Sequence, residues 1–508
     1  MSAMAPQQQI SFNAWKTILV LCGSVIIFLY LNTGMSPALP SIESQFDVSS
    51  EVASWVMTAY MVCGAVMTVI MGRLADLFGA KKMQMIMMIC FTVGTILAPF
   101  APNFSILIAL RVLEGVAVAT TPISTKLIRD NVPASKFPVG MSIYLACYMG
   151  GMAIGAVMGP VIAANIGWQG SFYLIAPFAV VILFASWKFI HVDESKKIDE
   201  HARIDRERSS DTSKKAKRQG KHIDYIGIAV MTVTLVSFLV AITYSSSITT
   251  NLARFAVPLV IGVISMVIFF IVEKRVKDPL VNLKLILHPV IFSGNIMMLM
   301  FGILEYFIIT GTPQLGAAPP PSGLGLDPLH TGLLQLAFGL AGMIFGPIFG
   351  LILANGIAKG KPTNLKMLVP GIGIVVITYL MLLFFHYSSG GINLALFVFG
   401  IASGIGPNAV IVTTTSFTPR EYTGMGSSIT NMMRIVGAAI GPVLVTVILA
   451  IATIPITVDN VEKNYPDPMT YNILYALGLA MSIGCVFLAI RVRRLATKTK
   501  PLTIDQMR

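Results

Sequence analysis

Two long stretches of this chain contain no Asp, Glu, Lys or Arg, and they limit its possible folds more than any other feature. The first covers residues 137–187, which is 51 residues, and the second covers 367–419, which is 53 residues. A membrane-spanning helix needs about 20 apolar residues, so each stretch is long enough for two spans and a turn. The turns are predicted at 165–170 and 388–391, which are rich in small and polar residues.

The composition agrees with a chain whose main solvent is lipid. Charged residues make up 12% of the 508 residues, hydrophobic residues make up 55%, and the mean hydropathy is +0.79. Soluble domains carry about 25% charged residues, so a soluble globular protein is excluded. The span-length rule predicts fourteen spans in groups of six, two and six. They are 15–35, 52–71, 83–99, 104–127, 139–163, 172–190, 225–244, 255–272, 290–310, 331–353, 367–385, 393–414, 426–452 and 471–490.

The positions of lysine and arginine predict the orientation of the spans, because these residues accumulate in cytoplasmic loops. With both termini in the cytoplasm, 32 of the 36 Lys and Arg residues fall on the cytoplasmic side. Arg254 and Lys463 fall outside the cell, and Arg111 and Arg434 fall within the membrane. Topology therefore explains most of the net charge of +13, and no nucleic-acid partner is predicted.

The spans predict an all-α polytopic membrane protein made of two six-helix bundles and a two-helix insert. All five cysteines fall inside predicted spans, so disulfides and metal clusters are not expected, and no cofactor is predicted. The predicted segments are a cytoplasmic N-terminal tail at 1–14, the N-terminal bundle at 15–190, a charged cytoplasmic linker at 191–222, the insert at 223–273, a cytoplasmic connector at 274–289, the C-terminal bundle at 290–490 and a cytoplasmic tail at 491–508.

One short glycine and proline pattern occurs twice, at an offset of 282 residues. The copies are Gly155-Ala-Val-Met-Gly159-Pro160-Val161 and Gly437-Ala-Ala-Ile-Gly441-Pro442-Val443. Small residues let neighbouring membrane helices approach closely, and proline bends a helix. The spacing is what two homologous six-helix halves separated by a two-helix insert would produce, and two such halves form a cavity at their interface.

Several function classes are excluded by what the chain does not contain. Nothing matches the phosphate-binding Gly-x-x-x-x-Gly-Lys-Ser/Thr loop, so this chain alone does not pump with ATP. A membrane enzyme would need a nucleophile, a metal or paired acids near one membrane face, and no such cluster is visible, so no enzyme activity is predicted. Secondary transport is favoured, and a channel or a receptor is the other class left open.

Charged residues inside membranes are costly and are treated as functional candidates. Arg111 and Glu114 are three residues apart and share a helix face; their pair is either an exchangeable acid for antiport or a permanent ion pair. Glu305, beside Tyr306, has no partner on its own helix, so it is expected to be protonated and to carry protons, to attract a cationic solute, or to make a structural hydrogen bond. Arg434 is predicted to be a structural partner of a carbonyl or an acid, with substrate contact as the alternative.

Aromatic side chains that share a helix face have a simpler interpretation. Tyr144 and Tyr148 lie four residues apart, and core packing is predicted for both. Aromatic and methionine side chains that line a cavity would suit varied apolar cations.

The segment that follows the second predicted span resembles a family signature. It reads Gly72-Arg73-Leu74-Ala75-Asp76-Leu77-Phe78-Gly79-Ala80-Lys81-Lys82. This resembles the loop signature of the major facilitator superfamily, Gly-x-Leu-Ala-Asp-x-x-Gly-basic-x-basic, with an alanine in the first basic slot. In that family the loop latches the two halves on the cytoplasmic side. The resemblance implies this role for Gly72, Arg73, Asp76, Gly79, Lys81 and Lys82.

Further motifs resemble the drug-exporting branch of the same family. Arg111-Val-Leu-Glu114-Gly115 resembles its Arg-x-x-Gln-Gly motif, with glutamate in place of glutamine. Gly151, Gly155, Gly159 and Pro160 resemble the fifth-helix signature of antiporters. With 168–177 and 223–227, the resemblance to the fourteen-helix drug:proton antiporter group covers the whole chain. It implies the major facilitator fold, and we expect a monomer in the lipid bilayer of the plasma membrane.

The end of the first span departs from that group. The group often has Leu-Asp-x-Thr there, whereas this chain has Leu31 in the slot of the acid, followed by Asn32 and Thr33. An asparagine does not titrate near neutral pH, so proton coupling must use another acid.

The sequence therefore predicts a secondary active transporter that exports lipophilic or cationic drugs in exchange for protons by alternating access. The candidates for proton coupling or substrate contact are Glu114, Arg111, Glu305, Asn32 and Tyr306. The alternative is a major-facilitator transporter of a specific metabolite with a different coupling ion or none.

Overall fold

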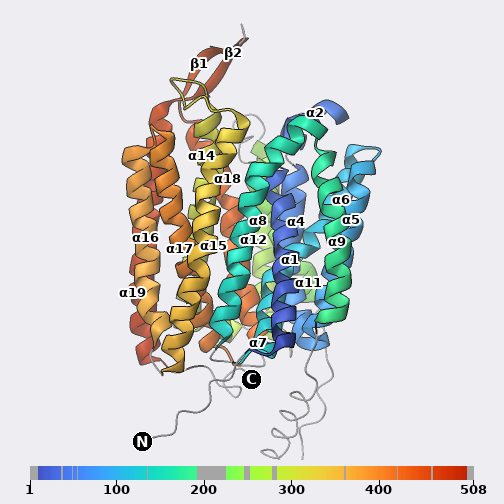
Figure 1. Ribbon diagram of the computed structural model, residues 1–508, viewed down its shortest axis with the longest axis vertical. Helices are drawn as coiled ribbons and strands as arrows, with labels where there is room; N and C mark the ends of the chain where they lie inside the picture. The colour runs from blue at the N-terminus through green and yellow to red at the C-terminus, as the bar shows by residue number, and fades with distance from the viewer. Residues whose placement is uncertain are drawn as a thin grey trace, which may run out of the picture.

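Long, nearly parallel helices make up most of the molecule (Figure 1). The computed structural model describes residues 10–35, 38–48, 50–53, 55–133, 136–190, 225–244, 252–276, 283–359, 362–419, 422–458, 461–499 and 501. The predicted linker at 191–222 lies outside the described residues.

The N-terminal half contains the first six spans. Side-chain caps fix two of the helix starts: Ser11 accepts a hydrogen bond from the Ala14 N–H, and Asn103 accepts one from the Ile106 N–H. The fourth span is a composite of two α-helices joined by a tighter 3₁₀ turn. The helices are α1 (Phe12–Gly34), α2 (Leu39–Phe46), α3 (Ser50–Ala53), α4 (Trp55–Phe78), α5 (Ala80–Leu97), η2 (Ala98–Phe100), α6 (Phe104–Gly115), η3 (Val116–Ala119), α7 (Thr120–Asn131), α8 (Phe137–Ile166) and α9 (Gln169–Phe189).

The insert and the C-terminal half follow. They consist of α11 (Tyr225–Thr243), α12 (Leu252–Arg275), α13 (Leu283–Leu287), α14 (Pro289–Ala317), α15 (Pro328–Ala358), α16 (Thr363–Phe385), α17 (Ser389–Ser416), α18 (Thr423–Leu449), β1 (Thr453–Val458), β2 (Val461–Pro466) and α19 (Pro468–Lys498). The strands form an antiparallel hairpin in which Thr453 faces Pro466. This hairpin is a difference from the predicted all-helical chain.

The helix lengths agree with the predicted number of membrane spans. Within the described residues, thirteen helices are long and apolar enough to cross a membrane, and α11 adds a shorter apolar stretch, Ile226–Phe238. The predicted fourteen-helix fold class is therefore confirmed. Some edges differ, since α19 continues to Lys498, past the predicted end at 490. The cytoplasmic placement of the termini stays a prediction.

Two ends of the molecule can be distinguished by the elements that they carry. The hairpin β1–β2 and the short helix α2 lie at one end, which we call the hairpin end, and α7 lies at the other, which we call the opposite end (Figure 1). Under the predicted topology, the hairpin end faces the outside of the cell.

Both copies of the glycine and proline pattern pack against the first helix of their own half. In α8, a Cβ on Gly159 would lie 2.5 Å from the Gly34 Cα of α1, and a Cβ on Gly151 would lie 2.8 Å from the Ile26 carbonyl oxygen. In α18, a Cβ on Gly437 would collide with the Leu299 carbonyl of α14, and one on Gly441 would lie 2.6 Å from the Tyr306 Cβ. The two copies therefore do the same packing work in the two halves.

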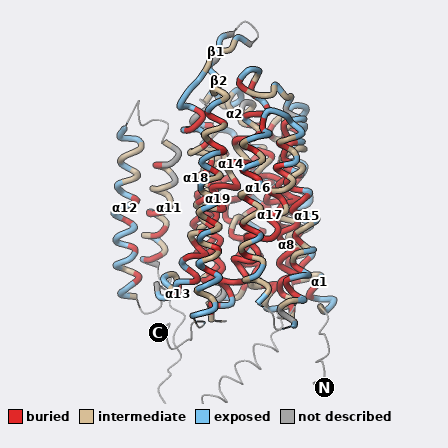
Figure 2. The backbone as a smooth tube through the Cα atoms, turned by 90° about the vertical axis from the view of Figure 1, so that its left-hand side faces the viewer, coloured by how far each residue is buried: buried red, intermediate tan, exposed pale blue. Residues whose placement is uncertain are grey.

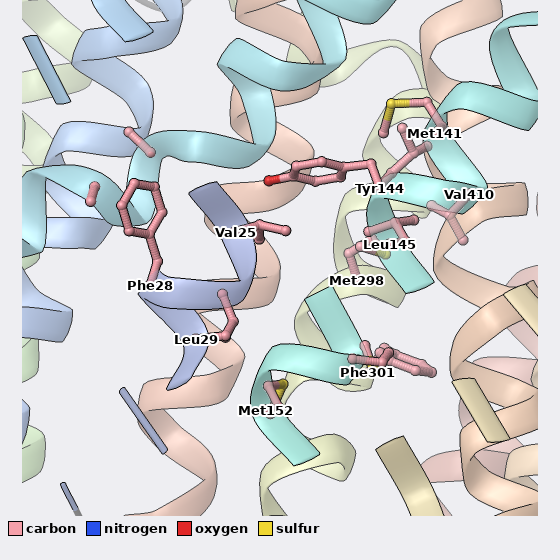
Figure 3. Close-up of a cluster of buried hydrophobic side chains, with 14 of the residues drawn as sticks. Val25, Phe28, Leu29, Met141, Tyr144, Leu145, Met152, Met298, Phe301 and Val410 are labelled. Atoms are coloured by element: carbon pink, nitrogen blue, oxygen red, sulfur yellow. The ribbon is translucent and has the colours of Figure 1, made fainter. Parts of the chain in front are cut away.

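Buried apolar side chains form a core that extends through both halves. Figure 3 shows the part where α1, α8 and α14 supply the side chains. The labelled residues are Val25, Phe28, Leu29, Met141, Tyr144, Leu145, Met152, Met298, Phe301 and Val410. Tyr144 is fully buried here, so its predicted place in the core is confirmed.

The insert stands at the side of the main helical body (Figure 2). Helix α12 is mostly exposed, and its exposed residues include Val257, Val260 and Ile264, as expected for a surface that faces lipid. Helix α11 lies between α12 and the two halves. Its Val236 packs on a small cluster formed by Val62 and Ala65 of α4 and Ile435 of α18. The insert therefore touches both halves.

The segment that resembles the family signature is more helical than a loop. Residues up to Phe78 belong to the last turns of α4, and α5 begins at Ala80, so the turn between the two helices is Gly79 alone. Gly79 has φ +99°, a conformation that residues with a Cβ rarely adopt. The predicted loop is therefore a sharp glycine corner between two helices.

Candidate functional site

A cavity of about 1080 Å³ lies between the two halves. Helices α1, α4 and α8 supply its walls from the N-terminal half, and α14, α15 and α18 supply them from the C-terminal half. It is also lined by Leu39 and Ser41 of α2 and by Leu326 in the loop before α15, so it extends toward the hairpin end. Pro160 and Pro442, the prolines of the two repeat copies, both line it. The cavity predicted from the repeat is thus present at the expected interface.

The chemistry of the cavity wall is apolar with scattered neutral polar groups. Among the described lining residues there is no Asp, Glu, Lys or Arg. The larger apolar side chains are Met57, Met61, Met152, Tyr306 and Phe338. The polar side chains are those of Asn32, Thr33, Ser41, Thr58, Thr310, Gln314, Thr331, Gln335 and Thr446. Such a surface can hold a bulky apolar molecule and bind it at a few polar points.

A buried ion pair lies at the inner end of the cavity. The Arg434 guanidinium on α18 donates a hydrogen bond to the Glu305 carboxylate on α14 over 2.9 Å. Each residue precedes the cavity wall on its own helix: Tyr306 follows Glu305, and Ala438, one turn beyond Arg434, also lines the cavity. The pair is therefore placed where the cavity ends, on the side away from the hairpin end.

The same arginine connects the two halves. Its second terminal nitrogen donates a hydrogen bond to the Tyr148 hydroxyl on α8 over 2.8 Å, and the guanidinium carbon lies 4.9 Å from the centre of the Tyr148 ring. Core packing is therefore the wrong prediction for Tyr148, because its polar tip takes part in this network. Tyr148, Arg434 and Glu305 link α8 of one half to α18 and α14 of the other.

The structure corrects the expectation for Glu305. Its side chain is fully buried, and Arg434 is its partner, so the expected protonated acid without a charged partner is wrong for this conformation. One carboxylate oxygen, Oε1, has no hydrogen-bond partner in the described part of the chain. The expectation for Arg434, a partner for an acid, is what the structure shows.

Arg111 and Glu114 form a second ion pair, as their spacing predicted. The Arg111 Nη1 lies 2.5 Å from the Glu114 Oε2, and both side chains are fully buried. Thr95 of α5 donates a hydrogen bond to Glu114 over 2.8 Å, and Arg111 donates one to the Val56 carbonyl of α4 over 3.2 Å. The pair joins α4, α5 and α6 within the N-terminal half, and neither residue lines the cavity. This arrangement favours the permanent ion pair among the two predicted alternatives.

Asn32 and Tyr306 lie in the cavity wall, on the first helix of each half. The Asn32 side chain is 5% exposed, and its Oδ1 has no hydrogen-bond partner among the described residues. Leu31, which occupies the slot of the usual acid, is fully buried and does not line the cavity. The sequence therefore identified two wall residues from opposite halves.

The signature segment is distant from this chemistry. Gly72 is buried, Arg73 is half-buried and Lys82 is exposed, and neither they nor Gly79 and Lys81 line the cavity. The side chain of Asp76 lies outside the described residues. A latch between the two halves stays a prediction for this segment.

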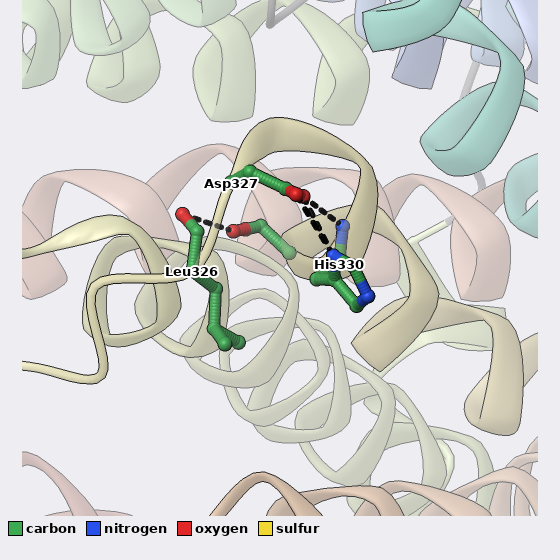
Figure 4. A network of polar contacts seen from close by, with 4 residues as sticks. Leu326, Asp327 and His330 are labelled. Atoms are coloured by element: carbon green, nitrogen blue, oxygen red, sulfur yellow. Dashed lines mark hydrogen bonds and ion pairs between the residues drawn. The ribbon is translucent and has the colours of Figure 1, made fainter.

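A polar pair that the sequence analysis missed lies at the mouth of the cavity (Figure 4). The His330 Nδ1 lies 2.9 Å from both Asp327 carboxylate oxygens, and the His330 N–H donates a hydrogen bond to Asp327. These hydrogen bonds hold the pKa of Asp327 below its usual value. Leu326 and Thr331 on either side line the cavity. The signal was an acid three residues before a histidine at the start of a helix.

The described residues contain no group of three His, Cys, Asp or Glu side chains that could hold a metal ion. The chemistry of the site is therefore that of ion pairs, neutral hydrogen bonds and apolar contacts.

Known proteins resemble this chain over most of its length. The family model of the Major Facilitator Superfamily matches residues 21–442. The multidrug resistance protein Stp of Mycobacterium tuberculosis is 24% identical over 467 residues, covering 90% of this chain and 80% of the relative. The multidrug efflux pump LfrA of Mycolicibacterium smegmatis is 24% identical over 437 residues, covering 84% and 79%. The tetracenomycin C resistance and export protein of Streptomyces glaucescens is 22% identical over 461 residues, covering 88% and 78%.

A solved structure has the same fold. The crystal structure of the human organic anion transporter MFSD10 matches with a TM-score of 0.61 and 13% sequence identity, covering 94% of this chain and 99% of that one. The family match and the spans make the chain a multi-pass membrane protein, and its relatives support the predicted plasma membrane location. The family match covers well over half of the chain, and this protein belongs to the Major Facilitator Superfamily, in its multidrug efflux group.

Proposed function

We propose that this protein is a secondary active transporter that exports lipophilic small molecules in exchange for protons. The observation that carries the proposal is the cavity between the halves, which ends at the Glu305, Arg434 and Tyr148 network. The names of the relatives, which concern drug resistance and export, support the direction of transport. Under the predicted topology, the cavity faces the outside, which is the orientation from which an exported compound leaves.

Glu305 is the acid that we propose for proton coupling. In the present arrangement Arg434 stabilises its ionised form and also holds Tyr148 of the other half. A proton on Glu305 would remove the negative charge that Arg434 balances, and a buried unpaired charge is strongly unfavourable. Arg434 would then change partners, and its bond to Tyr148 across the interface would change with it. Protonation at one atom is thereby connected to the packing of the two halves.

The driving force is large enough for this purpose. One pH unit is worth about 1.4 kcal/mol per proton, and one charge that crosses 100 mV gains about 2.3 kcal/mol. Together they exceed the roughly 1.4 kcal/mol that a tenfold concentration ratio of a neutral solute requires.

The Arg111–Glu114 pair has a structural role in this proposal. It ties three helices of one half together, which lets the half move as one body.

The test is transport by purified protein in proteoliposomes with an imposed pH gradient. A neutral lipophilic fluorescent dye and a lipophilic cationic dye serve as substrates. Glu305→Gln should abolish accumulation driven by the gradient while exchange of labelled for unlabelled dye continues, because the glutamine cannot titrate. Glu114→Gln is the matched control and should keep the gradient-driven component. If Glu305→Gln accumulates dye as the unmodified protein does, Glu305 is not the coupling acid.

Transport of a specific metabolite with different or no ion coupling is the second candidate. The neutral residues Leu31 and Asn32, at the place where related drug exporters often carry an acid, favour it. Growth protection in cells that express the protein, measured across dyes, antiseptics and metabolites, would separate the two functions.

A further inference from the structure

We propose that the cavity selects uncharged compounds with a large apolar surface and at least one hydrogen-bond donor, and that the Asn32 Oδ1 accepts that hydrogen bond. The proposal rests on the proposed transport function and narrows its substrate class. It begins from the Asn32 side chain, which lines the cavity and is 95% removed from solvent, with a 5% exposed fraction.

Asn32 is the polar group of the wall whose bonding capacity is least used. The Thr33 hydroxyl donates to the Leu29 and Met152 carbonyls over 2.8 and 3.1 Å, and the Gln335 amide donates to the Thr312 hydroxyl over 2.9 Å. The Asn32 Oδ1 has no partner among the described residues. Buried acceptors are nearly always paired, because an unpaired one loses the hydrogen bonds that it makes in water. An N–H or O–H group of a bound ligand would supply the partner.

The charge distribution argues against a cation as the preferred ligand. No acid is present among the described wall residues. The nearest ion pair exposes its positive member, because the Arg434 side chain is 10% exposed while that of Glu305 is fully buried. A cation at the inner end of the cavity would therefore meet a guanidinium before a carboxylate.

The size of the competing terms supports the same conclusion. The rings of Tyr306 and Phe338 could attract a cation by about 0.5–2 kcal/mol. Removing an ion from water costs several kcal/mol even in a relaxed protein site. Ring attraction alone does not offset this cost, whereas an uncharged compound does not incur it.

The rest of the wall sets shape tolerance and not charge selectivity. Met57, Met61 and Met152 come from α4 and α8, and methionine side chains adapt to different ligand shapes. The volume of about 1080 Å³ is at the upper limit of drug-sized pockets, roughly 300–1,000 Å³. Different apolar bodies can therefore be held while Asn32 binds a donor that they share.

The experiment measures equilibrium binding to the purified full-length protein in lipid nanodiscs without any gradient. The probes are a coumarin that carries a secondary amide, its N-methyl amide without a donor, its quaternary ammonium derivative and its carboxylate. The unmodified protein should bind the secondary amide about tenfold or more tightly than both charged probes. Asn32→Leu should weaken binding of the secondary amide by about 2- to 12-fold, the value of one hydrogen bond, and should leave the N-methyl amide unchanged. Asn32→Asp should shift the preference toward the quaternary ammonium probe.

The controls keep the result interpretable. Asn472→Leu is the matched substitution outside the cavity, on an exposed position of α19, and should not change any affinity. Size-exclusion profiles and melting temperatures show that each variant is folded. The proposal is overturned if a charged probe binds the unmodified protein as tightly as the secondary amide, if no probe binds, or if Asn32→Leu weakens both amides equally. The predicted binding order without proton-driven flux would instead sustain this proposal and reject proton-coupled export.

Discussion

Arg111, Glu114, Glu305 and Arg434 form two buried ion pairs that differ in how far apart their members lie in the sequence. Arg111 and Glu114 are three residues apart, so helical periodicity alone predicts their contact. Glu305 and Arg434 are 129 residues apart, and their contact depends on how α14 packs against α18. Sequence reasoning therefore identified all four residues but placed only the local pair together. Tyr148 was missed for the same reason, because its partner lies 286 residues away.

Local chemistry also gives a pH-dependent property to the hairpin end. His386, just beyond α16, is 1% exposed, and its ring centre lies 3.9 Å from that of Tyr387 and 5.3 Å from that of Tyr475. Burial lowers the pKa of His386 below its ordinary value, and its hydrogen bonds to the Leu382 and Leu383 backbone act in the opposite direction but are outweighed. The folded chain therefore binds this proton less readily than the unfolded chain.

The sign of the effect follows from that difference. Stability from neutral His386 is present above the unfolded pKa of about 6.5 and is lost as the pH falls through it toward the lower folded value. The melting temperature in detergent should drop between pH 7.5 and pH 5.5, and His386→Gln should reduce that drop. Between pH 7.5 and 8.5, where the histidine is neutral in both states, the two proteins should respond alike. An equal drop in both proteins at acid pH would contradict this assignment.

At the scale of elements, the repeat was predictable and the details of its connections were not. Gly155, Gly159 and their counterparts predicted equivalent helix contacts, and the structure places both copies against the first helix of each half. The strands β1 and β2 were missed because the segment is short, contains proline at Pro455 and Pro466 and follows a long apolar span. Gly79 appeared as part of a loop because its backbone angle, which makes the corner, cannot be seen in the sequence.

The repeat predicts that Gly437→Ala will be damaging. The added Cβ would collide with the Leu299 carbonyl of α14, and helix backbones cannot give way as a flexible side chain can. Overpacking of this kind costs about 1–3 kcal/mol, which should lower the melting temperature and the transport rate. Gly373→Ala is the matched control, because a Cβ there meets nothing within 4 Å. Similar melting temperatures for the two variants would show that the contact between α18 and α14 is not tightly packed.

The whole molecule is organised around an interface that is open at one end. The cavity extends toward the hairpin end, and beyond its inner end the halves pack directly. Gly346 of α15 faces Ala146 of α8, and a Cβ on Gly346 would lie 3.7 Å from that of Ala146. This separation is close to the mean of about 3.8 Å between the Cβ atoms of a disulfide. The two-bundle organisation was predicted from composition and repeat spacing, whereas the open end depends on tertiary packing alone.

A disulfide at this position should lock the present conformation. The test uses Ala146→Cys with Gly346→Cys in a chain whose five native cysteines are replaced by alanine. Oxidation should stop transport if the halves must separate here, and a reducing agent should restore it, while binding to the open cavity persists. Each single cysteine variant serves as the control. Full transport after complete cross-linking would show that the halves do not separate between α8 and α15.

The insert has a consequence for kinetics. Val236 of α11 rests on Val62 and Ala65 of one half and on Ile435 of the other, and the Tyr244 ring lies 6.1 Å from that of Trp55. Any relative movement of the halves must slide at least one of these apolar surfaces past α11. Since apolar contacts have little directional preference, such sliding changes the free energy of the end states less than that of the path between them. The insert would then act as friction, which sets how fast the transporter turns over and leaves how far it can concentrate its substrate unchanged.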